Sequence, residues 1–228
     1  MRKFIVFLMM MFVVVSTSAQ KDVTTFLGIP VDGFKSEMRK KLIDKGFTPI
    51  PGEGDSYLEG EFNGTDVYLS IVTNNNKVYR ITLLDKNSRN EADIKVRFNT
   101  LVRQFENNAR YVTPRSFTIS EDEDISYEMM VNNKIYEASF YQNVDFEKVD
   151  TLALQNYTRQ ELLKQFTEEQ IANNTHSVQN AFTEIAANFF SELLLKKSVW
   201  FRISERYGKY YIAMYYDNEY NHANGEDL

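Results

Sequence analysis

Between Tyr57 and Leu83 the chain alternates apolar and polar residues across two turns, and this pattern constrains the fold more than any other feature. The segment Tyr57 to Phe62 runs into Asn63-Gly64, a pair that favours the tight turn of a β-hairpin, and the chain returns as DVYLSIV. After turn residues Asn74 to Asn76, VYRITLL supplies a third strand. Its predicted apolar face is Tyr79, Ile81 and Leu83. One apolar and one polar face per strand is typical of an antiparallel sheet covered on one side.

Two more groups of strands are predicted. RSFTI lies near Phe117, and ISYEMM and KIYEASFY flank a turn at Asn132-Asn133. VWFRIS and YYIAMYY surround Gly208 and form a last hairpin, followed by a polar tail from Asp217. The blocks DVYLSIVTNNNKVYRITL and ISYEMMVNNKIYEASFY resemble each other, which fits a tandem repeat of a helix-plus-meander unit and fits equally well the likeness of any two hairpins.

Helical periodicity separates the strand groups. A first helix is expected from about Phe34 to Lys45, ended by Gly46 in a Schellman motif that brings Phe47 onto Leu42. A second is expected from roughly Asn90 to Asn107, behind a capping box of Ser88 and Glu91. The buried stripe predicted for it is Ile94, Phe98, Leu101, Val102 and Phe105.

A long helical region follows and continues to about Lys196. Thr158 with Glu161 and Thr167 with Gln170 are each able to form a capping box, and Asn173-Asn174 is a candidate break. The sequence therefore predicts an α+β fold, with an antiparallel sheet built from two tandem helix-plus-β-meander modules and helices on one face. Residues 20–110 would form the first module, and residues 111–228 the second, with the long helix and the final hairpin.

The first nineteen residues have the layout of a secretory signal peptide. Arg2 and Lys3 precede an apolar run from Phe4 to Val15, and small residues end at Ala19. The run is shorter than the ~20 residues that span a bilayer, so we expect export with cleavage and no transmembrane segment afterwards. The periplasm and the extracellular medium both remain open as destinations.

Charge and cysteine content exclude several classes of function. The formal net charge of −6 becomes −8 when Arg2 and Lys3 are removed, which disfavours nucleic acid as a partner. The chain has no cysteine, so it can form neither a disulfide framework nor a thiolate zinc site. An exported chain of this kind depends on its core, and a hydrophobic content of 43% supports one.

Motifs for catalysis are weak. Gly28 and Gly33 have the glycine spacing of a phosphate-binding loop, but Phe34 and Lys35 replace its Lys and Ser/Thr, so a structural turn is expected. His176 and His222 do not form a two-histidine metal motif. The acidic run Glu121 to Asp124 lacks the glycine of an EF-hand loop and is expected to be a solvated turn. The sequence predicts no catalytic residues, no metal and no cofactor.

Aromatic residues gather in the final hairpin, and we expect the binding surface there. If Val199, Phe201 and Ile203 face the helices, Trp200 and Arg202 share the opposite face. Which tyrosines join them depends on the register, and burial of both faces is the alternative. The predicted contact residues are Trp200, Arg202, Tyr207, Tyr210 and Tyr216.

The segment FLGIPVDGFKSEMRKKLIDKGF, with the Asn-Gly hairpin and VTNNNKVYRITL that follow, resembles the start of uncharacterised exported proteins of Bacteroidetes. The resemblance covers roughly Thr25 to Tyr111, and that family provides no catalytic residues. More distantly, helix-plus-meander units are similar to the β-lactamase-inhibitor-protein-like fold and to small outer-membrane assembly lipoproteins. That resemblance implies a binding role through an open sheet face, although this chain lacks the cysteines of both groups.

The expected function is a non-enzymatic binding protein of the bacterial envelope or secreted fraction, with a protein or carbohydrate as ligand. One alternative is a hydrolase that acts on glycans through two carboxylates about 5–9 Å apart. The other is a purely structural component of the envelope.

Overall fold

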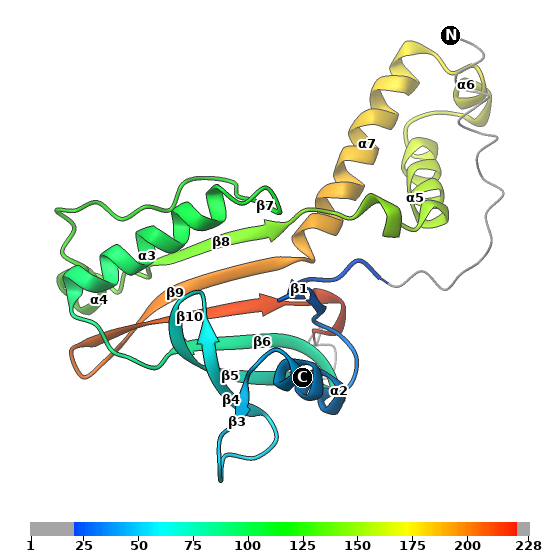
Figure 1. Cartoon of the computed structure of the whole chain (residues 1–228). Helices are drawn as coiled ribbons and strands as arrows, with labels where there is room; N and C mark the ends of the chain where they lie inside the picture. Colours follow the sequence, from blue (N-terminus) through cyan, green and yellow to red (C-terminus); the bar gives the residue numbers. More distant parts are fainter. Residues whose placement is uncertain (1–20, 223–228) are drawn as a thin grey trace. The chain divides into compact units, whose positions relative to one another are not determined.

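A computed structural model describes residues 21–222, which form two compact units (Figure 1). The larger unit comprises residues 23–144 and 187–222, and the smaller comprises residues 21–22 and 145–186. The expected module boundary at residue 110 falls inside the larger unit. The expected signal peptide, residues 1–19, lies outside the described residues.

An eight-stranded antiparallel sheet dominates the larger unit, as the α+β prediction requires. Its strand order is β3-β4-β5-β6-β10-β9-β8-β7, so the last hairpin of the sequence lies in the middle of the sheet (Figure 1). The strands are β3 (Thr48–Pro49), β4 (Tyr57–Phe62), β5 (Thr65–Asn74), β6 (Lys77–Asp85), β7 (Tyr111–Val112), β8 (Glu137–Gln142), β9 (Ser198–Arg206) and β10 (Lys209–Asp217). A separate two-stranded sheet pairs β1 (Thr25–Phe26) with β2 (Ile29–Pro30).

The first meander forms as predicted, except for one register shift. Asn63 and Gly64 both have positive φ, as the expected tight turn requires. Val72 pairs with Arg80 but Thr73 pairs with Val78, so Tyr79 is an extra residue in β6. The bulge puts Val78 in the core in place of Tyr79, which corrects the predicted apolar set.

Both long helices of this unit pack on one face of the sheet. Helix α2 (Lys35–Asp44) buries Met38 and Leu42 in the same core as the strands. It ends in the predicted Schellman motif: the amide of Phe47 donates to the carbonyl of Leu42, and that of Gly46 donates to Ile43. Helix α3 (Glu91–Glu106) buries the predicted stripe of five residues.

The cap of α3 differs from the prediction. Asn90 is the N-cap, and its side chain accepts a hydrogen bond from the amide of Asp93. Ser88 is two residues too early for this role. Glu91, the expected partner of Ser88, accepts instead from the amide of Ile125 (2.8 Å) and from the hydroxyl of Ser126 (2.5 Å).

The second meander does not form, because ISYEMMV is helix α4 (Ile125–Val131). Asp124 caps this helix by accepting from the amide of Tyr127, and the carboxylate of Glu91 holds its first turn. RSFTI also forms no strand: the backbone of Ile119 exchanges two hydrogen bonds with the side chain of Asn99 on α3. The predicted tandem repeat therefore has only one meander.

The smaller unit is helical. It contains η1 (Phe146–Lys148), α5 (Thr151–Leu163), α6 (Glu168–Ala172) and the first part of α7 (His176–Leu195). Its core is formed by Leu162, Val178 and Ile185. The capping box of Thr167 and Gln170 is confirmed, as is the break at Asn173-Asn174.

The candidate capping box of Thr158 and Glu161 does not form, because Asp150 caps the helix that contains both residues. Thr158 lies inside α5, where its hydroxyl donates to the carbonyl of Leu154. A short turn, η2 (Glu219–Asn221), follows β10 in the larger unit. Among the described residues, no helix combines the length and hydropathy needed to cross a membrane.

Candidate functional site

The register of the final hairpin divides the five predicted contact residues. Val199, Phe201 and Ile203 lie in the core, as expected, so Trp200 and Arg202 point to the outer face of the sheet. Tyr207 is 88% exposed in the turn between β9 and β10. Tyr210 and Tyr216, however, are buried on the helix-covered face. The register pairs them with Glu205 and Val199, which lie on the same face of β9 as Phe201 and Ile203.

The two buried tyrosines have separate environments. The hydroxyl of Tyr210 lies 2.6 Å from the hydroxyl of Ser126, and its backbone exchanges two hydrogen bonds with Arg89. It therefore helps to join α4 to the sheet. Tyr216 packs edge-on against Phe26, with ring centroids 4.9 Å apart. The predicted residues thus do not form one site.

A cluster around Trp200 occupies the outer face. The indole stacks on the ring of Tyr215, its cross-strand partner, with centroids 3.9 Å apart and planes at 19°. The guanidinium of Arg80 lies 5.1 Å from the centre of the Tyr215 ring and 5.5 Å from that of Trp200. These distances allow cation–π attraction to both rings.

Asp217 fixes this cluster from one side. Its carboxylate accepts from Nε (2.6 Å) and Nη2 (2.8 Å) of Arg80, and from Nε1 of Trp200 (2.8 Å). Hydrogen bonding to Asp217 raises the pKa of Arg80, despite the opposing effect of burial. The Asp217 side chain is only 3% exposed, so the polar tail expected from this residue begins later. Period-two alternation along β10 could have predicted that Tyr215 lies on the outer face. It could not have predicted the pairing of Arg80 with Asp217, because these residues are 137 positions apart in the chain.

Two rows of side chains extend from the cluster across the outer face. One follows the Cα pairing Ser70–Thr82–Tyr215–Trp200–Ser139. The next follows Tyr68–Leu84–Ala213–Arg202–Glu137. Tyr68 and Leu84 are large apolar residues that are about two-fifths exposed, at 41% and 38%. The face therefore presents aromatic and aliphatic groups together with the cation of Arg202.

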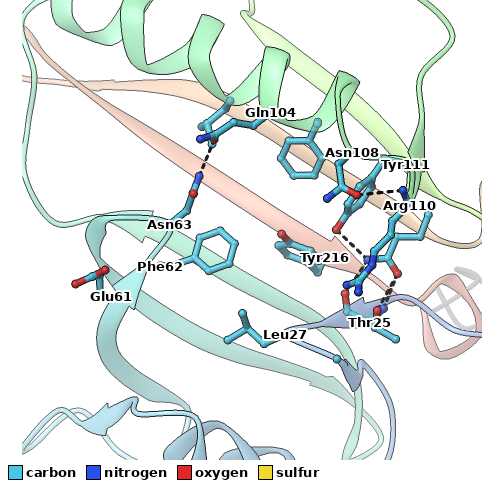
Figure 2. A pocket seen from close by; sticks show the side chains of 14 residues that line it. Thr25, Leu27, Glu61, Phe62, Asn63, Gln104, Asn108, Arg110, Tyr111 and Tyr216 are labelled. Carbon is cyan, nitrogen blue, oxygen red and sulfur yellow. Dashed lines mark hydrogen bonds between the residues drawn. The ribbon is translucent and has the colours of Figure 1, made fainter.

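On the opposite face, a cleft of about 520 Å³ lies beside α3 (Figure 2). Phe62 and Tyr216 lie at its centre, Asn63 and Gln104 at one end, and Arg110, Tyr111 and Thr25 at the other (Figure 2). Its lining comes from the β1–β2 hairpin, the β4–β5 turn, α3, β7, β8 and β10. Sequence reasoning missed it, because these segments are far apart in the chain.

Polar groups in the cleft are largely bonded to one another. The amide of Asn63 donates to Gln104 (2.7 Å), and the amide of Gln142 both donates to and accepts from the backbone of Thr25. Gln142 also donates to the hydroxyl of Tyr111, which is hydrogen-bonded to Tyr216. Burial raises the pKa of Tyr216 well above its usual value, so this hydroxyl stays protonated.

The chemistry that the cleft offers is limited. Glu61 is the carboxylate among the described residues that line it, so the cleft does not supply the pair that glycoside hydrolysis uses. The guanidinium of Arg110 has no hydrogen bond or ion pair to another described residue. The cleft could therefore attract an anion, but its described lining residues do not include a nucleophile with an adjacent base.

The other candidates have structural partners. Gly28 turns the β1–β2 hairpin and Gly33 precedes α2, both with positive φ, in place of a phosphate-binding loop. In the acidic run, Glu123 pairs with Lys134 and accepts from Tyr136. Within residues 21–222, no group of three or more acidic or histidine side chains is arranged to hold a metal ion.

Comparison with known proteins adds no relative: no family model, curated protein or solved structure matches the chain.

Proposed function

We propose that this chain is a non-enzymatic binding protein of the bacterial envelope or secreted fraction. Its contact surface is the outer face of the sheet around Trp200, and its partner is another protein. The observation that supports this most directly is that the cluster around Trp200 is preorganised. Asp217 accepts hydrogen bonds from both Trp200 and Arg80 and so holds them in one arrangement without a partner.

Fixation matters because binding is opposed by the entropy lost when side chains become ordered. An immobilised, rotamer-rich side chain costs about 0.5–1.5 kcal/mol at an interface. Here Trp200, Tyr215 and Arg80 are already ordered by stacking and by three hydrogen bonds to Asp217. Trp, Tyr and Arg are also the residue types that most often dominate the free energy of protein association.

The geometry favours a protein over a carbohydrate at this surface. A sugar ring stacks on an open aromatic face, but Tyr215 covers one face of the Trp200 indole and Arg80 lies close to both rings. The two hollows described in the larger unit are lined by other residues than Trp200. A broad surface with a fixed aromatic centre suits a partner that is itself broad.

Quantitative affinity capture tests the proposal. The processed chain, immobilised, is exposed to envelope and medium fractions of the source bacterium, and bound proteins are quantified by mass spectrometry. Three baits are compared: the wild type, the double variant Trp200→Ala/Arg202→Ala, and Val96→Ser as a matched control. Val96 is 64% exposed on α3, on the opposite face of the sheet.

We expect one partner to be enriched by the wild type and by Val96→Ser and to fall at least about tenfold on the double variant, as loss of a binding hot spot predicts. A partner that binds all three baits equally would place the contact surface elsewhere. Enrichment of glycans in place of protein, measured on a glycan array with the same baits, would contradict the choice of a protein partner.

A further inference from the structure

One edge of the sheet is only partly paired. β8 has six residues, but its outer neighbour β7 has two, which pair with Tyr141 and Gln142. The residue that would face Ser139 if β7 continued is Pro114. Proline has no amide hydrogen to donate to a ladder, so β7 ends before it.

The backbone direction of β8 shows which groups this leaves open. Tyr136, Ala138, Phe140 and Gln142 bond to β9, as shown by the bonds from Ile203 to Tyr136 and from Gln142 to Lys197. Because the direction of backbone groups alternates along a strand, those of Glu137 and Ser139 point away from β9. The carbonyl of Ser139 accepts weakly from the hydroxyl of Thr113 at 3.3 Å.

The remaining groups are the amide of Ser139 and both the amide and the carbonyl of Glu137. They have no hydrogen-bond partner among residues 21–222. They repeat every second residue, which is ~6.8 Å along an extended strand. Another extended backbone matches that spacing of donors and acceptors.

A hollow of about 440 Å³ lies along this edge. Its lining residues are Pro114, Arg115, Phe117, Ile135, Glu137, Ser139 and Tyr141. Ile135 is 68% exposed, which is high for a large aliphatic side chain beside a sheet. The exposed carboxylate of Glu137 forms no ion pair with another described residue. Beside the open backbone groups, the hollow thus offers an apolar wall and two charged groups. The carboxylate of Glu137 lies opposite Arg202 of β9 without an ion pair, and the guanidinium of Arg115 lies over the ring of Phe117.

We propose that β8 accepts an extended segment of a partner protein as an additional strand, which continues the line of β7 past Pro114. The segment carries a basic side chain opposite Glu137 and an apolar side chain against Ile135. Opposite charges on directly facing residues stabilise a strand pair. Backbone hydrogen bonds supply affinity, and the alternating side chains supply selectivity.

This inference rests on the proposed function and deepens it, because it names the kind of segment that the partner contributes. Ser139 on β8 is the cross-strand partner of Trp200 on β9. An added strand would therefore lie one strand away from the Trp200 cluster. One partner could contact both the edge and the outer face of the sheet.

A second copy of the chain fits the edge less well. Two copies paired about a twofold axis at Glu137 would bring two carboxylates directly opposite each other, which destabilises a strand pair. Each copy also has a formal net charge of −6. A basic segment from another protein would place no carboxylate opposite Glu137 and would not be repelled by the negative charge of the chain.

A peptide library tests the inference. Random ten-residue peptides displayed on phage are selected on the full chain, and the enriched peptides are synthesised and their Kd measured by fluorescence anisotropy. We expect alternating sequences with a central Lys or Arg. On binding, the backbone amides of Glu137 and Ser139 should become protected from hydrogen exchange in NMR spectra.

Two variants of one residue separate backbone from side-chain effects. Ser139→Pro removes the open amide without touching the β8–β9 ladder and should weaken peptide binding at least about tenfold, since it removes a hydrogen bond and adds a steric obstacle. Ser139→Ala keeps the amide and should bind as the wild type does. If Ser139→Pro fails to fold, amide protection in the wild type decides the question.

Several outcomes would overturn the inference: no enriched peptide, equal affinity for Ser139→Pro and the wild type, absence of protection at both amides, or dimerisation of the chain through this edge in sedimentation. The variant Trp200→Ala distinguishes the two proposals. If this variant still binds the peptide and still captures the same partner, the outer face is not the contact surface. The proposal for the edge of β8 would then stand by itself.

Discussion

Single residues decide how closely the elements of this chain approach one another. Gly60 on β4 shows this most directly, because a Cβ atom added to it would lie 2.8 Å from Cδ1 of Phe47. Phe47 follows the Schellman motif of α2 and is almost fully buried. Because Gly60 has no side chain, the ring of Phe47, just after α2, can pack directly against β4.

Replacement of this glycine should consequently destabilise the fold. We expect Gly60→Ala to lower the free energy of unfolding by about 1–3 kcal/mol, because overpacking forces Phe47 or β4 to move. Urea denaturation followed by circular dichroism measures this. The control is Glu61→Ala on the same strand, because Glu61 is exposed and a surface substitution changes the free energy of unfolding by less than about 0.5 kcal/mol. Equal losses in both variants would contradict the packing argument.

At the scale of elements, the start of α3 organises its surroundings. Asn90 caps the helix, and the next residue, Glu91, holds the first turn of α4 through the amide of Ile125 and the hydroxyl of Ser126. Ser126 in turn lies within hydrogen-bond distance of Tyr210 on β10. One turn of helix thus connects α3, α4 and the sheet.

Substitution of the two candidate N-caps of α3 should change the free energy of unfolding by different amounts. Asn90→Ala should lower the free energy of unfolding by about 1 kcal/mol, the usual cost of a lost N-cap. Ser88→Ala should change it by less than about 0.5 kcal/mol, as a surface substitution does. Thermal unfolding of both variants beside the wild type measures the difference. A larger loss for Ser88→Ala would restore the cap expected from the sequence.

Glu91 should also make stability depend on pH. The hydrogen bond from Ser126 is the main reason why the pKa of Glu91 is lower than usual in the folded chain, and the amide of Ile125 adds to it. A lowered folded pKa stabilises the fold above the unfolded value of about 4.3, and this contribution is lost as the pH falls through the folded pKa. We expect the stability difference between the wild type and Glu91→Gln to shrink below about pH 4.

Denaturant titrations between pH 7 and pH 3 measure this difference. Glu106→Gln serves as the control, since Glu106 is an exposed glutamate at the other end of the same helix. A difference between the wild type and Glu91→Gln that stays constant over the whole range would contradict a role for the charged carboxylate.

At the scale of the whole molecule, the two units differ in how much core they have. Among residues 21–222, the core of the larger unit contains thirty buried residues, whereas that of the smaller unit contains Leu162, Val178 and Ile185. Since burial of apolar side chains is the main stabilising contribution to folding, the smaller unit should open at a lower free energy.

Hydrogen exchange followed by mass spectrometry tests this expectation. Peptides from residues 145–186 should exchange faster than peptides from β5 and β6. Ile185→Ala should accelerate exchange in the smaller unit, because truncation of a buried Ile costs about 2–5 kcal/mol, and should leave β5 and β6 unchanged. Acceleration of both units by the same factor would show that they unfold as one.

Part of this architecture follows from local sequence. Period-two alternation and Asn63-Gly64 specify the first meander, and four-residue spacing specifies α2 and α3, because each pattern is set by residues close in the chain. The same reasoning failed at Ile125–Val131. A short apolar run is compatible with strand or helix, and the choice was made by Asp124 together with Glu91, a residue 34 positions away.

The sequence by itself determined the α+β class and the turns of the first meander, and it predicted that Trp200 and Arg202 share a face, since alternation along a strand fixes which side chains point to the same side. Only the tertiary structure decided that β9 and β10 lie in the middle of the sheet, and that Tyr210 and Tyr216 are buried. It alone joined Asp217 to Arg80 and left the edge of β8 open after Pro114. These features depend on strand order and register, which arise from contacts between residues far apart in the chain.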